Sequence, residues 1–212
     1  MKIAIFGASG ATGMLLTELA LAQGHTLTAL VRTPARFSLA GSVQVVQGDA
    51  FDRGAIRRTL EGADAVLSAL GARSLGKEDV LERAVPLIVA EMEAISLERI
   101  VALGSAGALD SALDKQPAWR AWIVENLVYK TFLKWPVASQ RVQYKILAAS
   151  KLDWTMVMPP KLIGGAAKGN YRVDGDALPR NGSRIARADV AAFMLKQLDS
   201  AEWSRKGVYI SI

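Results

Sequence analysis

Cysteine is absent from the sequence, which excludes disulfides, thiolate catalysis and metal sites with cysteine ligands. Histidine occurs only as His25, which follows a glycine, so a helix-capping or surface role fits it better than catalysis. A Ser-His-Asp triad would require this residue, and no G-x-S-x-G motif surrounds Ser9 or Ser105. We therefore expect no metal site and no hydrolase mechanism.

Long apolar runs and blocks of like charge are also missing. No run approaches the length of a membrane span, and the N-terminus enters a strand pattern without the features of a signal peptide. The 26 basic residues against 20 acidic ones give a net charge of +6 that is spread along the chain, which argues against a nucleic-acid-binding arm. We expect a cytoplasmic monomer or homodimer that binds neither membrane nor nucleic acid, with a basic excess that partly serves an anionic cofactor.

The chain does contain a regular alternation of short apolar strands with helical patterns. The expected strands lie near residues 2–6, 26–31, 43–47, 64–68, 99–103 and 153–158, and the expected helices near 12–23, 53–61, 78–95 and 139–150. This βαβ repetition predicts an α/β fold of the Rossmann-like, doubly wound type: a mostly parallel sheet with helices on both faces and the ligand along the carboxyl ends of the strands. Pro86 should bend or break the third helix.

With 212 residues and 51% hydrophobic content, the chain can bury one full core, so we predict a single domain, 1–212. In this prediction about 1–150 form the cofactor-binding core, and about 151–212 contribute the substrate side as a small C-terminal extension. There we expect a short strand at 170–173, a helix that begins near Asp189 as its N-cap, and a terminal strand at 208–212.

The most informative motif is Gly7-Ala8-Ser9-Gly10-Ala11-Thr12-Gly13, directly after the first strand. A buried strand that turns through glycines into a helix directs free backbone N–H groups and the helix dipole towards whatever binds there. Gly7 permits the tight turn, Gly10 lets phosphates approach the backbone, and Gly13 lets the helix pack closely on the strand. The G-x-x-G-x-x-G spacing differs from the commoner G-x-G-x-x-G, and an ordinary strand-turn-helix is the alternative. We predict a dinucleotide pyrophosphate site made by Gly7, Ser9, Gly10, Ala11, Thr12 and Gly13.

The second expected strand ends at Arg32, and Arg36 follows in the next loop. In a Rossmann unit an acidic side chain at this place holds the ribose 2′-hydroxyl of NAD, and here that acid is missing. A guanidinium suits a phosphate instead, because its planar fork makes charge-assisted bidentate hydrogen bonds. We predict NADP(H) as the cofactor, with Arg32 as the main anchor and Arg36 as a second contact; two solvated loop arginines are the alternative.

The ends of the next three strands supply further candidates. Asp49, followed by Ala50, can accept a hydrogen bond from the adenine amine or cap the next helix. The small-residue turn at Leu70-Gly71 lets the backbone pass close to the cofactor, with Arg73 within reach of a phosphate. Ser105 lies where the nicotinamide is expected, so its hydroxyl can bond the carboxamide or the substrate, unless it is an ordinary turn serine.

A set of segments carries a family resemblance: residues 3–13, 30–32, 48–49, 70–71, 105–106, 158–160 and 183–190. Over nearly its whole length the chain resembles the atypical short-chain dehydrogenases/reductases, most closely the biliverdin reductase B/flavin reductase-like group and the broader NmrA-like NAD(P)-binding proteins. The resemblance implies an NADPH-dependent reductase of flavins, quinones or related conjugated acceptors, with Ser105 beside the nicotinamide. The group also includes members with no established activity, so kinship of fold does not determine the reaction.

The sequence departs from the usual pattern in two places. Classical short-chain dehydrogenases use a Tyr-x-x-x-Lys pair on one helix face, whereas this chain has only the adjacent pairs Tyr129-Lys130 and Tyr144-Lys145. Lys161 follows Pro159-Pro160, where the closest biliverdin reductase relatives carry histidine, and it is either a counter-charge for an anionic substrate or a surface lysine. Hydride transfer to a flavin or quinone tolerates a missing acid, because the proton can come later from water.

We therefore predict an NADPH-dependent oxidoreductase that transfers a hydride to a flavin, quinone or related flat conjugated acceptor. Ser105, Tyr144 and Lys161 are the candidate catalytic residues. Two other functions stay open: a non-catalytic NADP(H)-sensing regulatory protein of the NmrA-like kind, and a sugar-nucleotide epimerase-like enzyme, against which the missing Tyr-x-x-x-Lys counts.

Residues 119–135 are unusually aromatic. Apolar side chains recur there at three or four positions, which predicts a helix packed on the core. Because this segment follows the strand that leads to the expected nicotinamide site, a mobile cover over the substrate cleft is the alternative, with Trp119 in contact with the acceptor.

Overall fold

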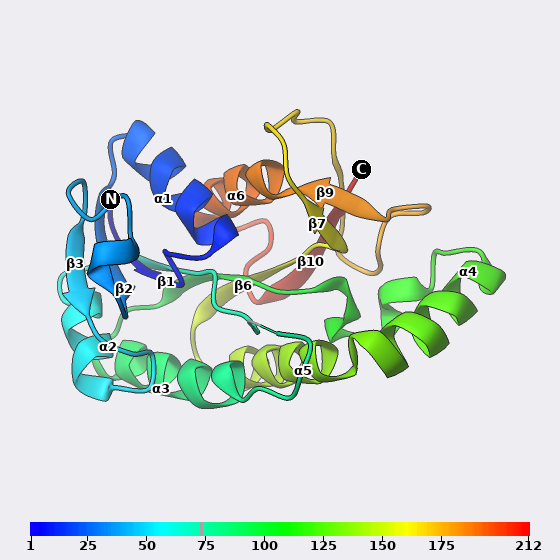
Figure 1. Ribbon diagram of the computed structural model, residues 1–212, viewed down its shortest axis with the longest axis horizontal. Coiled ribbons are helices and arrows are strands. Elements are labelled where there is room, and N and C mark those ends of the chain that lie inside the picture. The colour runs from blue at the N-terminus through cyan, green and yellow to red at the C-terminus, as the bar shows by residue number, and fades with distance from the viewer. Residues whose placement is uncertain (73) are drawn as a thin grey trace.

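The computed structural model describes residues 1–72 and 74–212, so the phosphate contact predicted for Arg73 lies outside the described residues. Within this part of the chain, an eight-stranded sheet lies between two layers of helices (Figure 1). A second, two-stranded sheet lies beside the C-terminal strand.

The elements alternate along the chain as the sequence pattern predicts. The strands are β1 (Lys2–Phe6), β2 (Thr26–Val31), β3 (Gln44–Gln47), β4 (Ala65–Ser68), β5 (Arg99–Leu103), β6 (Asp153–Met158), β7 (Lys161–Ile163), β8 (Arg172–Asp174), β9 (Arg184–Ala186) and β10 (Lys206–Ser211). The α-helices are α1 (Ala11–Ala22), α2 (Arg53–Leu60), α3 (Val80–Ala94), α4 (Ala118–Ile123), α5 (Lys134–Ala149) and α6 (Arg187–Lys196). A π-helical segment, η4 (Val124–Phe132), joins α4 to α5, and short 3₁₀ turns are η1 (Pro34–Arg36), η2 (Ala106–Ala108), η3 (Asp110–Leu113) and η5 (Gln197–Asp199).

The large sheet has the strand order β3-β2-β1-β4-β5-β6-β10-β8, and all pairs are parallel except β10 with β8. The chain moves outward from β1 to β3 and then crosses to β4 on the other side of β1. The order therefore reverses between β1 and β4. At such a switch point the loops after the two strands diverge, which leaves a crevice at the carboxyl edge of the sheet.

Both faces of the sheet are buried, as parallel sheets require. Along β1, Ile3 and Ile5 belong to the core under α1 and α6, whereas Ala4 and Phe6 belong to the core under α2, α3 and α5. Figure 1 shows these two helix layers on opposite sides of the sheet. The Rossmann-like, doubly wound fold predicted from the sequence is confirmed.

Two details of the helices correct the sequence prediction. Helix α3 runs through Pro86 without a break, so the predicted break is wrong, while the alternative of a bend stays a prediction. Helix α6 begins at Arg187, so Asp189 lies in its first turn and is not its N-cap. The buried carboxylate of Asp189 instead accepts hydrogen bonds from the backbone N–H groups of Lys168 and Gly169, both at 2.8 Å, and thereby anchors the loop after β7.

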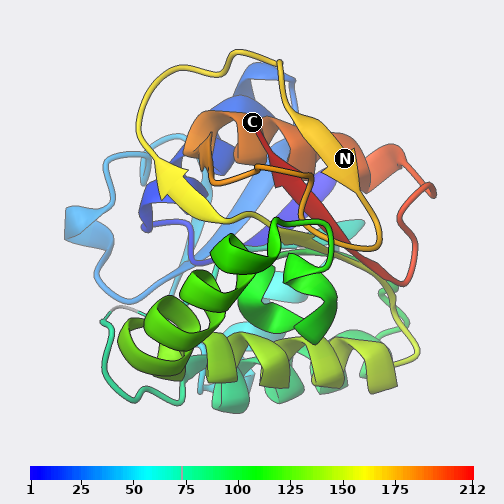
Figure 2. The ribbon, with the colours of Figure 1, turned by 90° about the vertical axis from the view of Figure 1, so that its right-hand side faces the viewer.

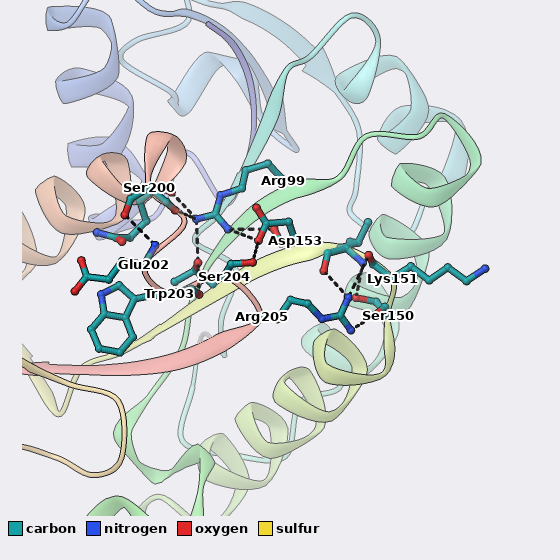
Figure 3. A network of polar contacts seen from close by, with 12 residues as sticks. Arg99, Ser150, Lys151, Asp153, Ser200, Glu202, Trp203, Ser204 and Arg205 are labelled. Atoms are coloured by element: carbon teal, nitrogen blue, oxygen red, sulfur yellow. Dashed lines mark hydrogen bonds and ion pairs between the residues drawn. The ribbon is translucent and has the colours of Figure 1, made fainter.

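The amino edge of the sheet is tied together by a polar network centred on Arg99 (Figure 3). Its guanidinium donates to Asp153 Oδ1 at 3.2 Å, to Thr155 Oγ1 at 2.9 Å and to the carbonyl oxygens of Gln197 and Ser200. Because Arg99 and Asp153 begin β5 and β6, this network lies at the opposite end of the strands from the carboxyl-edge crevice. We assign it a structural role.

The buried carboxylate of Glu91 joins helices α2 and α3 through ion pairs with the exposed Arg53 and Arg57. Glu91 is 1% exposed and accepts hydrogen bonds from Arg53 Nε at 2.9 Å and Arg57 Nε at 3.0 Å. These two arginines lower the pKa of Glu91 below its ordinary value of 4.5. The pair therefore stabilises the fold above the unfolded-state pKa, and this contribution is lost as pH falls through the folded-state pKa.

We expect Glu91→Gln to lower the free energy of unfolding at neutral pH by about 1.5–3 kcal/mol, the range for hydrogen bonds to charged groups. The difference from wild type should shrink in acid, because protonation removes the same charge from the wild-type protein. Denaturant titrations at neutral and at acidic pH measure the free energy of unfolding of the variant and of wild type. Glu18→Gln, on the exposed face of α1, is the control. If the two variants lost the same free energy of unfolding, the stabilising role of the ion pairs at Glu91 would be contradicted.

Candidate functional site

The turn between β1 and α1 is built around Gly7, whose φ of +79° lies in the left-handed region that favours glycine. The carbonyl of Gly7 accepts a hydrogen bond from the N–H of Gly10 at 3.0 Å, and Gly10 is the N-cap residue of α1. Because Gly10 has no side chain, it offers no capping oxygen to the N–H groups in the first turn of α1. This end of the helix is therefore suited to hydrogen-bond an anion.

Gly13 lies where α1 passes closest to that turn. A Cβ built on Gly13 would stand 2.0 Å from the carbonyl oxygen of Gly7 and 2.8 Å from its carbonyl carbon. Both are backbone atoms, so neither can swing aside to make room. The structure therefore shows the close packing of helix on strand that the motif predicts. This packing requires glycine at position 13.

A cavity of about 290 Å³ opens at the switch point, and we call it the β1–β4 cavity. Its lining comes from the carboxyl ends of β1, β2, β3 and β4 and from the start of α3. The predicted cofactor residues that line it are Gly7, Ser9, Gly10, Arg32, Asp49, Ala50, Leu70 and Gly71. The fold thus brings together residues that span the first third of the sequence.

The remaining predicted cofactor residues lie outside the described lining of this cavity. Ala11, Thr12 and Gly13 form the first turn of α1, where Thr12 and Gly13 are buried. Arg36 ends η1 and is exposed, so its role as a second phosphate contact stays a prediction. Arg32 is also exposed, but it follows β2 directly and lines the cavity.

The structure rules out one of the two roles that the sequence left open for Asp49. The N-cap of α2 is Asp52, whose Oδ1 accepts hydrogen bonds from Gly54 N at 2.8 Å and Ala55 N at 3.2 Å. Asp49 Oδ1 instead accepts a hydrogen bond from Phe51 N at 3.2 Å, and the residue lines the β1–β4 cavity. The helix-cap role is therefore wrong, and the adenine contact stays a prediction.

A larger cavity of about 760 Å³, the β5–β6 cavity, lies farther along the same carboxyl edge. Ser105 follows β5, while Pro159, Pro160 and Lys161 follow β6, and all four line it. The rest of the lining comes mainly from η4 and from the loops before β9. Since β4 and β5 are adjacent strands, the two cavities occupy neighbouring places along one edge of the sheet.

Hydrogen bonds on both sides hold the backbone at Ser105. Gly104 N donates to Val157 O at 2.7 Å, and Ala106 N donates to Pro159 O at 2.9 Å. From helix α5, the buried Gln143 donates through Nε2 to Leu103 O at 2.9 Å. The position of Ser105 in the β5–β6 cavity is therefore fixed by β6 and by α5.

The β5–β6 cavity is apolar with a cationic border. Leucine, valine, phenylalanine and proline side chains form most of its lining. Arg120, Lys161 and Arg187 also line it, and no aspartate or glutamate is among the described lining residues. Arg120 donates to Gly182 O at 3.2 Å, which links α4 to the loop before β9. The cavity suits a flat apolar body with an anionic substituent.

The structure does not bring Tyr144 to this cavity, which corrects the expected grouping with Ser105 and Lys161. Tyr144 points from α5 towards the core, where its ring packs edge-on against Trp154 with the ring centroids 5.4 Å apart. Tyr129 lines the cavity instead, and burial raises its pKa to about 12. Tyr129 lies in the π-helical η4 and Tyr144 in α5, and the adjacent Tyr-Lys pairs of the sequence do not distinguish the two tyrosines.

The aromatic segment does not pack on the core, so that expectation is wrong. Trp119 and Phe132 are 68% and 70% exposed, and Trp122 is 61% exposed. One side of η4 lines the β5–β6 cavity through Val124, Val128 and Phe132 among others. Trp119 is not among the described lining residues, which removes the basis for its predicted contact with the acceptor; that the segment is mobile stays a prediction.

The model of the NAD(P)H-binding family matches residues 7–201, a range that includes all the described lining residues of both cavities except Phe6. The chain belongs to this family. A putative exported protein from Burkholderia pseudomallei is similar in structure, with a TM-score of 0.81 and 28% identity over 100% of both chains. ChuY, an anaerobilin reductase from Escherichia coli O157:H7, has a TM-score of 0.83 and 22% identity over 100% of this chain and 97% of its own. A short-chain dehydrogenase/reductase from Veillonella parvula DSM 2008, in complex with NADP, has a TM-score of 0.79 and 19% identity over 100% of this chain and 94% of its own.

Membership in the NAD(P)H-binding family confirms that the cofactor is a nicotinamide dinucleotide, and it agrees with the NAD(P)-binding family that the sequence resembles. At their low identity, the likeness to ChuY and to the Veillonella protein establishes the fold alone. Among the described residues, no helix has the length and apolar character needed to cross a membrane. The cytoplasmic location and the oligomeric state stay predictions.

Proposed function

We propose that the protein is an NADPH-dependent reductase that transfers a hydride to a flat conjugated acceptor of the flavin, quinone or related class. The observation that carries this proposal is the pair of cavities on one sheet edge. One is lined by the glycine turn and Arg32, and the other is large, apolar and bordered by cations. The redox activity of ChuY and the NADP bound to the Veillonella neighbour agree with it.

The β1–β4 cavity fits the pyrophosphate, ribose and adenine parts of NADPH. The first turn of α1 presents backbone N–H groups to the pyrophosphate, and Gly7 and Gly10 leave room for it. Arg32 follows β2 and would supply the cation for the 2′-phosphate, and Asp49 would accept a hydrogen bond from the adenine amine. The cofactor would extend from there towards Ser105.

When bound, NADPH supplies the hydride. Ser105 would hydrogen-bond the nicotinamide carboxamide or the acceptor, from a backbone position that Gln143 and β6 fix. Lys161 would neutralise an acidic group on the acceptor, together with Arg120 and Arg187. The leucine, valine and proline walls would hold the acceptor ring and exclude water from it.

We assign no general acid to the described tyrosines of the β5–β6 cavity. Tyr129 lines it, but a phenol with a pKa of about 12 is a poor proton donor at neutral pH. Its ring serves as a wall in this proposal. The proton that completes the reduction would come from water, which suits a flavin or quinone better than an aliphatic ketone.

The test is NADPH oxidation against riboflavin, FMN, menadione, dichlorophenolindophenol and a simple aliphatic ketone. We expect turnover with at least one conjugated acceptor and none with the ketone. Ser105→Ala should lower kcat by roughly two- to tenfold, the value of one neutral hydrogen bond, and leave NADPH affinity nearly unchanged. Ser42→Ala, an exposed surface change, is the matched control.

Two outcomes would overturn the proposal. Turnover of the ketone without turnover of any conjugated acceptor would indicate a conventional dehydrogenase. Tight NADPH binding without oxidation by any acceptor would favour the non-catalytic NADP(H)-sensing protein.

A further inference from the structure

Residues 118–135, which we call the aromatic arm, hold most of the large apolar side chains that the described protein exposes. The exposed members of the arm are Trp119, Trp122, Ile123, Leu127, Phe132 and Trp135. They lie on two consecutive helical pieces, α4 and η4, and on the start of α5. Exposed apolar patches of this kind mark sites of interaction.

The arm has two apolar sides. Its inner side lines the β5–β6 cavity through Val124, Val128 and Leu133, and its outer side carries Trp119 and Trp122 into solvent. In Figure 1 the arm lies at the right-hand end of the molecule, and Figure 2 shows it facing the viewer in front of α5. An amphipathic helix that only closes the cavity would present a polar outer side, so the outer tryptophans need a different explanation.

The charges around the arm are mostly positive. It carries Arg120, Lys130 and Lys134 against the single acid Glu125, which pairs with Lys130 at 2.9 Å. Lys134 and Lys77 both stand over the ring of Trp135, at 5.0 Å and 5.5 Å from its centroid. Tryptophan and phenylalanine beside lysine and arginine form the composition of a helix that lies in the interface of an anionic lipid layer.

We propose that the aromatic arm docks the protein on the surface of an anionic lipid bilayer, with Trp119, Trp122 and Leu127 in the headgroup region and Lys130 and Lys134 against the lipid phosphates. A second copy of the chain fits the arm less well. Each arm carries three cations and one acid, so a symmetric pairing of two arms would bring two surfaces of like net charge together, and this net repulsion opposes the pairing. This proposal departs from the sequence expectation of no membrane partner, and it concerns a surface contact, not a span.

Docking would set the mouth of the acceptor cavity beside the lipid. Phe132 and Leu75 both line the β5–β6 cavity and are exposed, so they form an apolar path between the arm surface and the cavity. An acceptor dissolved in the bilayer would enter along this path. Only this consequence rests on the proposed reductase function; the docking itself does not.

The test is co-flotation of the whole protein with vesicles of pure phosphatidylcholine or of phosphatidylcholine mixed with phosphatidylglycerol, without cofactor or acceptor. We expect binding to the anionic vesicles, a blue shift of tryptophan emission, and loss of both at high salt. Trp122→Glu and Lys134→Glu should each weaken binding by roughly tenfold or more. Ile95→Glu, at an exposed apolar site on the far edge of the sheet, should leave it unchanged.

Circular dichroism and NADPH titration of each variant show whether it is folded. Anionic vesicles that do not bind the wild type at low salt would overturn the proposal, as would binding that Trp122→Glu and Lys134→Glu leave intact. A stable dimer that Trp122→Glu dissociates would instead assign the arm to a second copy. Since no turnover is measured, failure of the reductase proposal would leave these results unaffected.

Discussion

Arg32→Glu should reverse the cofactor preference of the protein from NADPH to NADH. Arg32 follows β2 and lines the β1–β4 cavity, at the place where the 2′-phosphate or 2′-hydroxyl of the adenosine ribose binds in this fold. A charge-assisted contact of about 1.5–3 kcal/mol gives roughly ten- to hundredfold discrimination in favour of NADPH. Glutamate removes that contact, repels the phosphate and accepts from the 2′-hydroxyl of NADH.

Fluorescence titration of wild type and variant with both nucleotides measures the ratio of the two dissociation constants. The wild-type preference should fall with added salt, because the contact is exposed to solvent. Arg58→Glu makes the same charge change at an exposed position of α2 outside the described cavity lining and should leave the ratio unchanged. Equal wild-type affinities for NADPH and NADH would contradict the assignment of Arg32.

Gly13→Ala should lower cofactor-dependent turnover on the order of a hundredfold and destabilise the fold. The added Cβ would stand 2.0 Å from the carbonyl oxygen of Gly7, so α1 must move away from the turn that binds the pyrophosphate. Overpacking of this kind costs about 1–3 kcal/mol of stability. Misplacement of the binding turn by about 1 Å would add a loss on the order of a hundredfold in turnover.

The control is Gly41→Ala, where a Cβ meets nothing within 4 Å. Thermal unfolding and NADPH titration of both variants separate the loss of stability from the loss of binding. A Gly13→Ala protein that binds NADPH as tightly as wild type would show that α1 does not depend on this close approach.

The sheet and the cofactor site were predictable because their signals are local. Strands buried on both faces form continuous apolar runs, and a turn such as that at Gly7 leaves glycines at fixed spacing. Arg32 and Asp49 followed from strand ends alone, since the carboxyl ends of parallel strands share one edge. The misplaced N-cap at Asp189 shows the limit of such patterns: an acid in the first turn of a helix can serve a neighbouring loop instead.

The acceptor side was less predictable because it depends on contacts between distant segments. Tyr129, which lines the β5–β6 cavity, lies in the π-helical η4. A π-helix has more residues per turn than an α-helix, so the α-helical spacing of apolar residues does not predict which side chains face the cavity. Strands β7 and β9 have three residues each, too few for an alternating pattern. The aromatic spacing of the arm is equally compatible with a buried helix, so only the fold shows that Trp119 and Trp122 are exposed.

The most direct test of the central claim is a single-turnover experiment with the protein already saturated with NADPH. The complex is mixed rapidly with FMN or menadione, and the absorbance of the dihydronicotinamide is followed. The experiment is repeated with NADPH that carries deuterium at the transferred position. We predict that bound NADPH is oxidised in one exponential phase, that deuteration slows this phase, and that Ser105→Ala slows it further. Bound NADPH that stays reduced with every conjugated acceptor would contradict the assignment as a reductase.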